Sequence, residues 1–179
     1  MPILDAWRGA QPGAVTVKNA ETILRDYFTT LLVLSAEFSF KPVPDTPYYL
    51  FFVDGQWQLS LVSPDEWGLR APGPCLGRCL LQPDMTWRIE PLTNPVSEPT
   101  LRDALRASHG GFIELLAATD TLEDGLPHYV NTLPYYRRLL AAGLANSLSR
   151  SLKLGGLDSI GTRHWLEAAG ATALLPART

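Results

Sequence analysis

The chain has 179 residues, of which 46% are hydrophobic and 18% charged, and its formal net charge is −3 at pH 7. These values are typical of a globular protein with its own core, and they argue against nucleic-acid binding, which normally needs a basic surface. The first residues lack the charged and apolar regions of a signal peptide. The most apolar helical segment, residues 23–38, carries three charges and is too short to span a bilayer. We therefore expect a cytoplasmic protein without membrane insertion or a nucleic-acid partner.

The sequence predicts an irregular lead-in over residues 1–15 and a helix from Asn19 to about Phe38. Asn19 suits an N-cap, Glu21 suits the first turn, and apolar residues recur at helical spacing. These apolar residues are Ala20, Ile23, Leu24, Tyr27, Phe28, Leu31, Leu34 and Phe38. Because the stripe is broad, the helix should be largely buried against a sheet. The proline-rich segment 41–47 that follows cannot be helical and predicts an extended connector.

A β-hairpin is the clearest local pattern in the chain. Residues 48–53 form an unbroken apolar and aromatic run, and the Asp54-Gly55 pair that follows favours a tight turn with positive φ at both positions. In the return strand Trp57, Leu59 and Leu61 alternate with polar residues, which predicts one buried face. The first strand is apolar on both faces and should lie deeper in the sheet.

The segment from Ser63 to Gly68 predicts a single capped helical turn. Ser63 suits the N-cap, Pro64 the first helical position, and the acids after it the positive end of the helix dipole. Glu66 completes a capping box, and Gly68 can end the turn with positive φ. We assign the hydroxyl and acidic groups of this turn to capping rather than to catalysis, and Trp67 to anchoring the turn.

The motif that runs from this hairpin to a second tryptophan reads YYL, S-x-x-SP-x-EWG, a proline, and LG-x-x-x-LQ-x-D-x-(S/T)W. Its positions are Tyr48, Tyr49, Leu50, Ser60, Ser63, Pro64, Glu66, Trp67, Gly68, Pro72, Leu76, Gly77, Leu81, Gln82, Asp84, Thr86 and Trp87. Over roughly residues 40–88 the chain resembles an uncharacterised family of bacteria and eukaryotes, the domain of unknown function 2452. The resemblance implies a shared local fold but no chemistry, because that family has no established activity.

Two further strands are predicted at residues 76–81 and 86–90, with a turn at Gln82-Pro83-Asp84. The expected architecture is α+β: an N-terminal helix packed on a small four-stranded antiparallel meander, followed by a C-terminal helical half. Asp84 is a candidate ligand-binding residue, but an acid in such a turn usually bonds to its own backbone, and we favour that role. The two cysteines, Cys75 and Cys79, would lie about 13 Å apart on one strand, too far for a disulfide. They are expected to be buried thiols in a reducing compartment, with no metal or other cofactor.

The proline-rich segment 91–99 is the candidate boundary between two regions, 1–96 with the helix and sheet, and 97–179, which is helical and packed on the first as one unit. Three helices are predicted in the second region, over residues 101–118, 132–154 and 162–169. Thr100 should cap the first, and Gly110-Gly111 should kink or divide it. The tail after the last helix contains Leu174 and Leu175.

Arg137 and Arg138 occupy the first turns of the helix over 132–154, where the helix dipole disfavours cations. They are candidates for binding an acidic partner surface or a phosphate; the alternative is pairing with Asp120, Glu123 and Asp124 just upstream. The same helix carries small residues at Ala141, Ala142, Gly143 and Ala145. This seam predicts close helix packing, either within the chain against the helix over 101–118 or in a homodimer.

The sequence contains no catalytic or phosphate-binding motif. We expect a non-enzymatic protein-interaction module, an adaptor or regulatory subunit, with Trp57, Trp67, Trp87, Arg137 and Arg138 as candidate contact residues for a protein partner. The alternative is a small-molecule-binding protein or enzyme with its pocket between the sheet and the helical half. In that case His128 would be the candidate binding residue and base, with Asp120 or Glu123 as its orienting partner.

Overall fold

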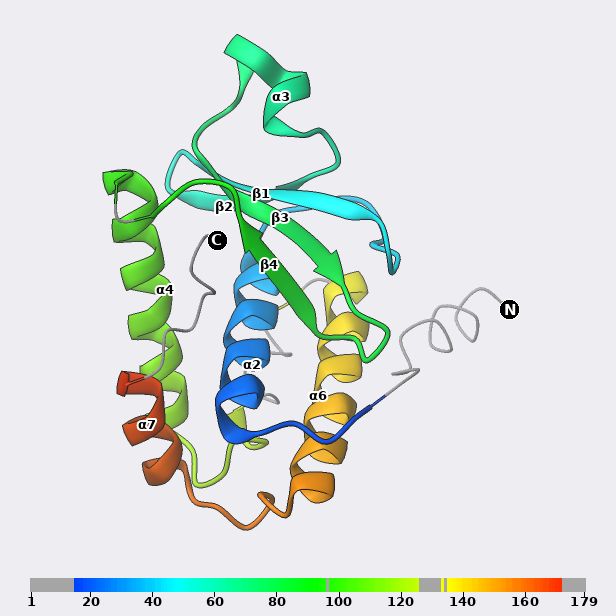
Figure 1. Ribbon diagram of the computed structural model, residues 1–179, viewed down its shortest axis with the longest axis vertical. Helices are drawn as coiled ribbons and strands as arrows, with labels where there is room; N and C mark the ends of the chain where they lie inside the picture. The colour runs from blue at the N-terminus through cyan, green and yellow to red at the C-terminus, as the bar shows by residue number, and fades with distance from the viewer. Residues whose placement is uncertain (1–14, 96, 126–132, 134, 172–179) are drawn as a thin grey trace.

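The computed structural model describes residues 15–95, 97–125, 133 and 135–171. It has an α+β architecture in which a four-stranded antiparallel sheet lies at one end of a group of helices (Figure 1). The elements in chain order are α2 (Ala20–Ser35), β1 (Pro47–Val53), β2 (Gln56–Ser60), α3 (Pro64–Trp67), a 3-10 helix (Gly68–Arg70), β3 (Cys75–Leu81), β4 (Trp87–Pro91), α4 (Pro99–Ala117), α6 (Tyr135–Gly155) and α7 (Thr162–Ala171). The N-terminal helix, the antiparallel sheet and the helical second half are all confirmed.

Helix α2 begins as predicted, because the Asn19 side chain accepts a hydrogen bond of 2.8 Å from the Thr22 amide. It ends three residues earlier than expected. Glu37 leaves the helix to pair with the β1–β2 hairpin: its amide donates to the Trp57 carbonyl oxygen at 2.8 Å, and its carbonyl accepts from the Leu59 amide at 2.9 Å. The helix therefore stops where its backbone is needed at the edge of the sheet.

The order of the strands is β2-β1-β3-β4, so the prediction of a simple meander is wrong in connectivity. Strand β1 pairs with both β2 and β3, which places it inside the sheet and explains why it is apolar on both faces. The turn between β1 and β2 has φ values of 48° at Asp54 and 84° at Gly55, as predicted. The chain then crosses over β1 through residues 61–74, a segment that includes α3.

The outer edge of β4 is completed by two adjacent threonines of α2. The Thr29 hydroxyl donates to the Trp87 carbonyl oxygen at 2.8 Å, and the Trp87 amide donates to the Thr30 hydroxyl oxygen at 2.9 Å. The exposed edge of a sheet normally has to be covered or charged to prevent pairing with other chains. Here side-chain hydroxyls replace a neighbouring strand, and they fix α2 against the sheet.

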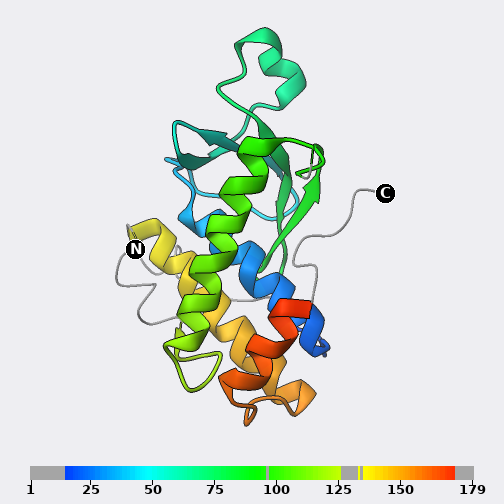
Figure 2. The ribbon, with the colours of Figure 1, turned by 90° about the vertical axis from the view of Figure 1, so that its left-hand side faces the viewer.

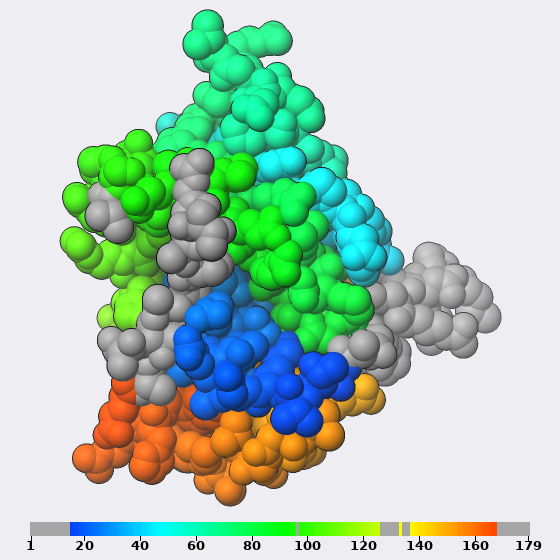
Figure 3. Space-filling view, in the orientation of Figure 1, coloured from blue at the N-terminus to red at the C-terminus, as the bar shows by residue number. Residues whose placement is uncertain are grey.

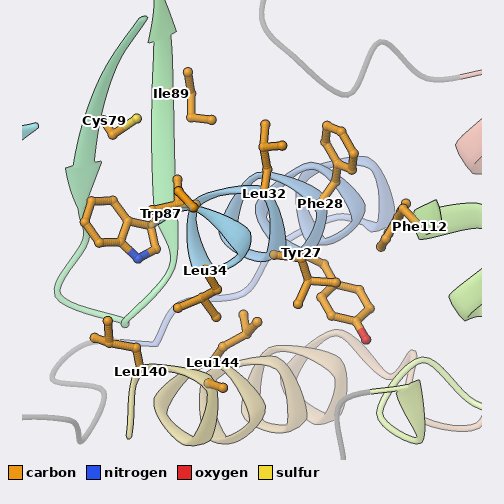
Figure 4. Close-up of a cluster of buried hydrophobic side chains, with 14 of the residues drawn as sticks. Tyr27, Phe28, Leu32, Leu34, Cys79, Trp87, Ile89, Phe112, Leu140 and Leu144 are labelled. Atoms are coloured by element: carbon orange, nitrogen blue, oxygen red, sulfur yellow. The ribbon is translucent and has the colours of Figure 1, made fainter. Parts of the chain in front are cut away.

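One hydrophobic cluster contains residues from both predicted regions, 1–96 and 97–179. In Figure 4 helix α2 lies at its centre, with Trp87 of β4 on one side, Phe112 of α4 on another, and Leu140 and Leu144 of α6 on a third. Because α2 contacts the sheet and every long helix, it organises the whole core.

The small-residue seam of α6 lies inside the chain. Ala141 and Gly143 are buried, and α6 packs against α2. Of the two packing alternatives, the intramolecular one is therefore seen, but the partner helix is α2 rather than the helix over 101–118. The predicted start of α6 at Thr132 lies outside the described residues.

Helix α4 runs without interruption through Gly110 and Gly111, so the predicted kink is wrong. Both glycines are exposed, and a Cβ atom at either would meet no other atom within 4 Å. Packing of the opposite face of α4 on the core outweighs their low helix propensity. The N-cap is Glu98 rather than Thr100, and its carboxylate accepts a hydrogen bond from the Thr100 amide. In the part of the chain that the structure describes, no helix is long and apolar enough to cross a membrane.

Candidate functional site

The sheet has a second covered face, on the side away from the helices, where α3 projects (Figure 1). Phe51 of β1 is only 1% exposed, yet it does not belong to the main hydrophobic cluster. Its side chain is covered from this second side instead. The α3 turn is held by the predicted cap, since the Glu66 amide donates to the Ser63 hydroxyl oxygen at 3.2 Å and Gly68 has a φ of 55°. The capping role of Ser63 is therefore confirmed.

An open groove of about 680 Å³ lies beside the edge strand β2; we call it the aromatic groove. Five segments form its walls: residues 37–40, β1, β2 with the residues after it, the α3 excursion, and the first turn of α6. The side chains that define it are Phe38, Phe40, Phe51, Leu61, Trp67 and Arg137. The Arg137 guanidinium carbon lies 5.1 Å from the centre of the Phe38 ring, a cation–π contact. The indole Nε1 of half-buried Trp67 is enclosed without a hydrogen-bond acceptor in the described part of the chain.

Two of the candidate contact residues, Trp67 and Arg137, thus meet in one groove. Trp57 and Trp87 do not: Trp87 is fully buried, and Trp57 lies in the core with its Nε1 donating to the Ser108 hydroxyl oxygen at 3.1 Å. The prediction that these two tryptophans contact a partner is wrong, because sheet and helix packing leaves them no free surface. His128 lies outside the described residues.

The two arginines at the start of α6 have different environments. The Arg138 Nε donates to the Leu133 carbonyl oxygen at 2.7 Å, and this side chain does not line the aromatic groove. The alternative of internal pairing with Asp120, Glu123 and Asp124 is not seen: no ion pair joins either arginine to these acids in the structure as described. Arg137 therefore contacts an aromatic ring and forms no ion pair among the described side chains, although Glu37 lines the same groove.

A second concave site, the lysine pocket, has a volume of about 480 Å³ and lies between α2 and the β3–β4 turn. The start of α2 and the residues before it lie directly against this turn in the space-filling view (Figure 3). The Lys18 Nζ atom is 2.6 Å from Asp26 Oδ2 and 2.5 Å from Asp84 Oδ2. The three side chains are 13%, 24% and 9% exposed, respectively, so the ion triad is largely out of water.

Asp84 fulfils the predicted turn role and adds a second one. Its Oδ1 accepts from the Thr86 amide at 3.1 Å and from the Thr86 hydroxyl at 2.6 Å, while Oδ2 binds Lys18. The turn bonds are local and follow from the sequence. The contribution of Lys18 was missed, because an isolated lysine just before a helix carries no local sign of a carboxylate 66 residues away.

Burial and charge act in opposite directions on the pKa values of the triad. Burial alone would lower the pKa of Lys18, but the hydrogen bonds and charges of the two carboxylates together raise it, so the ammonium is kept charged. For Asp26, burial raises the pKa more than Lys18 lowers it. For Asp84, burial is outweighed by the hydrogen bonds from Lys18 and Thr86 and by the Lys18 charge, and the pKa is lowered.

Both cysteines are free and buried, as predicted. Burial raises the pKa of the Cys75 thiol to about 11, and it raises the pKa of Cys79 still further. Thiols that remain protonated are poor nucleophiles and poor metal ligands. No group of three or more His, Cys, Asp or Glu side chains placed to hold a metal ion occurs among the described residues.

No protein-family model matches the sequence, and no solved structure matches the fold. The resemblance to the domain of unknown function 2452 therefore stays a prediction.

Proposed function

We propose that the chain is a non-enzymatic protein-interaction module, and that its aromatic groove binds an extended, apolar peptide segment carrying an acidic residue. The observation that supports this function is the meeting of Trp67 and Arg137, from opposite halves of the sequence, in one open groove. Tryptophan and arginine are the residue types most enriched at the energetic centres of protein interfaces.

The walls of the groove favour bulky apolar groups in the partner. Phe38, Phe40 and Trp67 are each half-buried, so a ligand that covers them removes further aromatic surface from water. Leu61 is 56% exposed at the same edge and extends the apolar surface.

The charge of Arg137 selects the polar part of the partner. Its guanidinium stacks on Phe38, and stacking leaves the N–H groups at the rim of the plane directed outward. A carboxylate accepts two such N–H groups in a bidentate pair, which is stronger and more specific than a contact with a single charge. An acidic side chain or a chain terminus of the partner is therefore the expected counter-ion.

The backbone of β2 is not the binding element in this proposal. Its outward-facing groups at Trp57 and Leu59 are already paired with Glu37. A partner peptide cannot add to the sheet as a further strand at that point, so side chains in the groove carry the affinity.

We expect selection from a displayed library of random peptides to enrich sequences that combine bulky apolar residues with aspartate or glutamate. Arg137→Glu should reduce the affinity for the enriched peptides by about tenfold or more, the loss of one charge-assisted contact, and Trp67→Ala should do the same by removing apolar contact. Titration calorimetry with the synthetic peptides measures both effects.

The matched control is Arg138→Glu, an identical charge reversal one residue away at a side chain that does not line the groove. It should bind the peptides like the unaltered chain. Equal losses of peptide affinity in Arg137→Glu and Arg138→Glu would show that only the net charge of the chain matters. A selection that enriches no peptide would contradict the proposed function.

The lysine pocket supports a second candidate function, the binding of a small anionic molecule. Arg25 lines this pocket, and its Nε is buried without an acceptor in the described part of the chain. Ile89 also lines this pocket. It lies two residues after Trp87 on the edge strand β4, so its backbone N–H and C=O groups point to the same outer side of the sheet as those of Trp87. The pocket lies between α2 and the sheet, not between the sheet and the C-terminal helical half.

Inorganic phosphate and small carboxylates are suitable probes for this second function. Binding should shift the amide NMR signals of Thr22, Arg25 and Ile89 while leaving those of Trp67 and Leu61 unchanged. Arg25→Met should abolish the shifts, since it removes the unpaired donor and retains the apolar stem. Shifts that are equal in Arg25→Met, or absent from the unaltered chain, would exclude this function.

A further inference from the structure

The α3 excursion, residues 61–74 between β2 and β3, is longer than the connection requires. Strands β2 and β3 lie on either side of β1 and are both antiparallel to it, so the chain has to run back along one strand and across two strand spacings, roughly 20 Å. The residues between Ser60 and Cys75 reach about 46 Å when extended. The surplus forms α3 and the 3-10 helix, which stand out from the sheet on the side away from the helices in both Figure 1 and Figure 2.

The tip of this excursion, residues 65–69, presents an apolar side chain close to two acids. Leu69 is fully exposed, directly after Gly68 with its positive φ. Asp65 and Glu66 are also exposed, and neither forms an ion pair among the described residues. Within the same part of the chain the Glu66 carboxylate accepts no hydrogen bond from the Ser63 amide, so the reciprocal half of the predicted capping box is not seen. Both carboxylates are therefore available to a cation.

The tip has the chemistry that the aromatic groove accepts. The groove presents the half-buried rings of Phe38 and Phe40 and the guanidinium of Arg137. One exposed leucine is common on protein surfaces and needs no partner by itself, but here an apolar group and two acids match an apolar and cationic groove. Leu69 does not line the groove of its own chain, so the tip of another copy has to supply it.

We propose that the aromatic groove binds the α3 tip of a second copy of this chain, with Leu69 on the rings of Phe38 and Phe40 and the two carboxylates facing Arg137. The inference rests on the proposed function, because it names a partner for the same groove. Trp67 of α3 is itself part of the groove wall, so tip and groove are adjacent on one face. One two-fold axis can therefore seat both tips at once, and the reciprocal contact closes a dimer rather than an open chain.

The first test is the molar mass in solution. Light scattering over a dilution series of the full chain should approach twice 19.7 kDa at high concentration. Leu69→Asp should raise the dissociation constant of the dimer at least about tenfold. The matched control is Leu92→Asp, at an exposed leucine that does not line the groove, and it should dimerise like the unaltered chain. A monomer at every concentration, or a dimer that Leu69→Asp leaves intact, overturns the proposal.

The second test exchanges the charges between copies. Arg137→Glu alone, and Asp65→Lys with Glu66→Lys in another chain, should each give monomers, because like charges would meet in both contacts. An equal mixture of the two variants should give a dimer, since every tip then faces a groove of opposite charge. Arg138→Glu is the control and should dimerise by itself. A mixture that stays monomeric contradicts the pairing, and species larger than a dimer contradict the two-fold closure.

Peptide selection with the monomeric Leu69→Asp variant separates this inference from the proposed function. If the unaltered chain is a monomer and peptides are still enriched, the dimer is wrong and the proposed function stands. If the chain dimerises through its tip and no peptide is enriched, the inference stands and the groove serves self-association alone. If both hold, the enriched peptides should dissociate the dimer, and a dimer that persists at saturating peptide overturns the shared site.

Discussion

Replacing Lys18 with methionine should lower the free energy of unfolding by about 3–5 kcal/mol. Removing one member of a buried ion group leaves the others without compensation, and that penalty exceeds the modest net contribution of the intact group. In this protein two carboxylates, Asp26 and Asp84, would remain at 24% and 9% exposure. Equilibrium unfolding in urea measures the loss directly.

The control is Lys41→Met, because Lys41 is an exposed lysine of the connector after α2, and its loss should change stability by no more than about 0.5 kcal/mol. If Lys18→Met lowers the free energy of unfolding no more than Lys41→Met does, the ion triad is more exposed to solvent than the structure indicates.

The pH dependence of the Lys18→Met effect follows from the direction of each pKa shift. The pKa of Lys18 is raised above 10.5 in the folded state, so its contribution is complete below pH 10.5 and is lost as the pH rises through the folded value. The pKa of Asp84 is lowered below 3.8, so its contribution is complete above pH 3.8 and is lost as the pH falls through the folded value. The pKa of Asp26 is raised, so protonation of this group favours the folded state and opposes the Asp84 effect in acid. The difference between the two proteins should therefore shrink above pH 10.5.

Trp87→Ala should also cost about 3–5 kcal/mol, the range for removing a large aromatic side chain from a core. Trp87 is fully buried, and its ring meets that of Tyr48 edge to face with the centres 5.8 Å apart. Trp67→Ala is the matched comparison, a half-buried tryptophan that belongs to the same sequence motif. It should lose less stability than Trp87→Ala while losing peptide binding. Thermal unfolding of both variants measures the contrast, and a more severe loss at Trp67 would mean that α3 is part of the core.

Local patterns in the sequence predicted local structure well. The Asp54-Gly55 turn, the Asn19 cap, the Ser63 cap and the Asp84 turn each depend on atoms only a few residues apart, and all are confirmed. The four strands were placed by the same kind of signal.

The features that the sequence did not reveal depend on distant partners. The crossover of β3 to the far side of β1 is decided by packing that no local pattern encodes. Gly110-Gly111 predicted a kink or a division of α4, because helix propensity was weighed without the tertiary contacts that keep the helix continuous. The aromatic groove combines five separate segments, so only one of its aromatic residues, Trp67, together with Arg137, was identified from the sequence.

The hydroxyl groups that Thr29 and Thr30 present to Trp87 have a consequence for biosynthesis. Helix α2 leaves the ribosome before β4 does, so the groups that protect the open side of this strand already exist when the strand emerges. A nascent chain that is stalled just after β4 contains both the threonine hydroxyls and the strand edge that they cover. A fragment that starts after α2 has neither hydroxyl and would expose an aggregation-prone strand for as long as it persists.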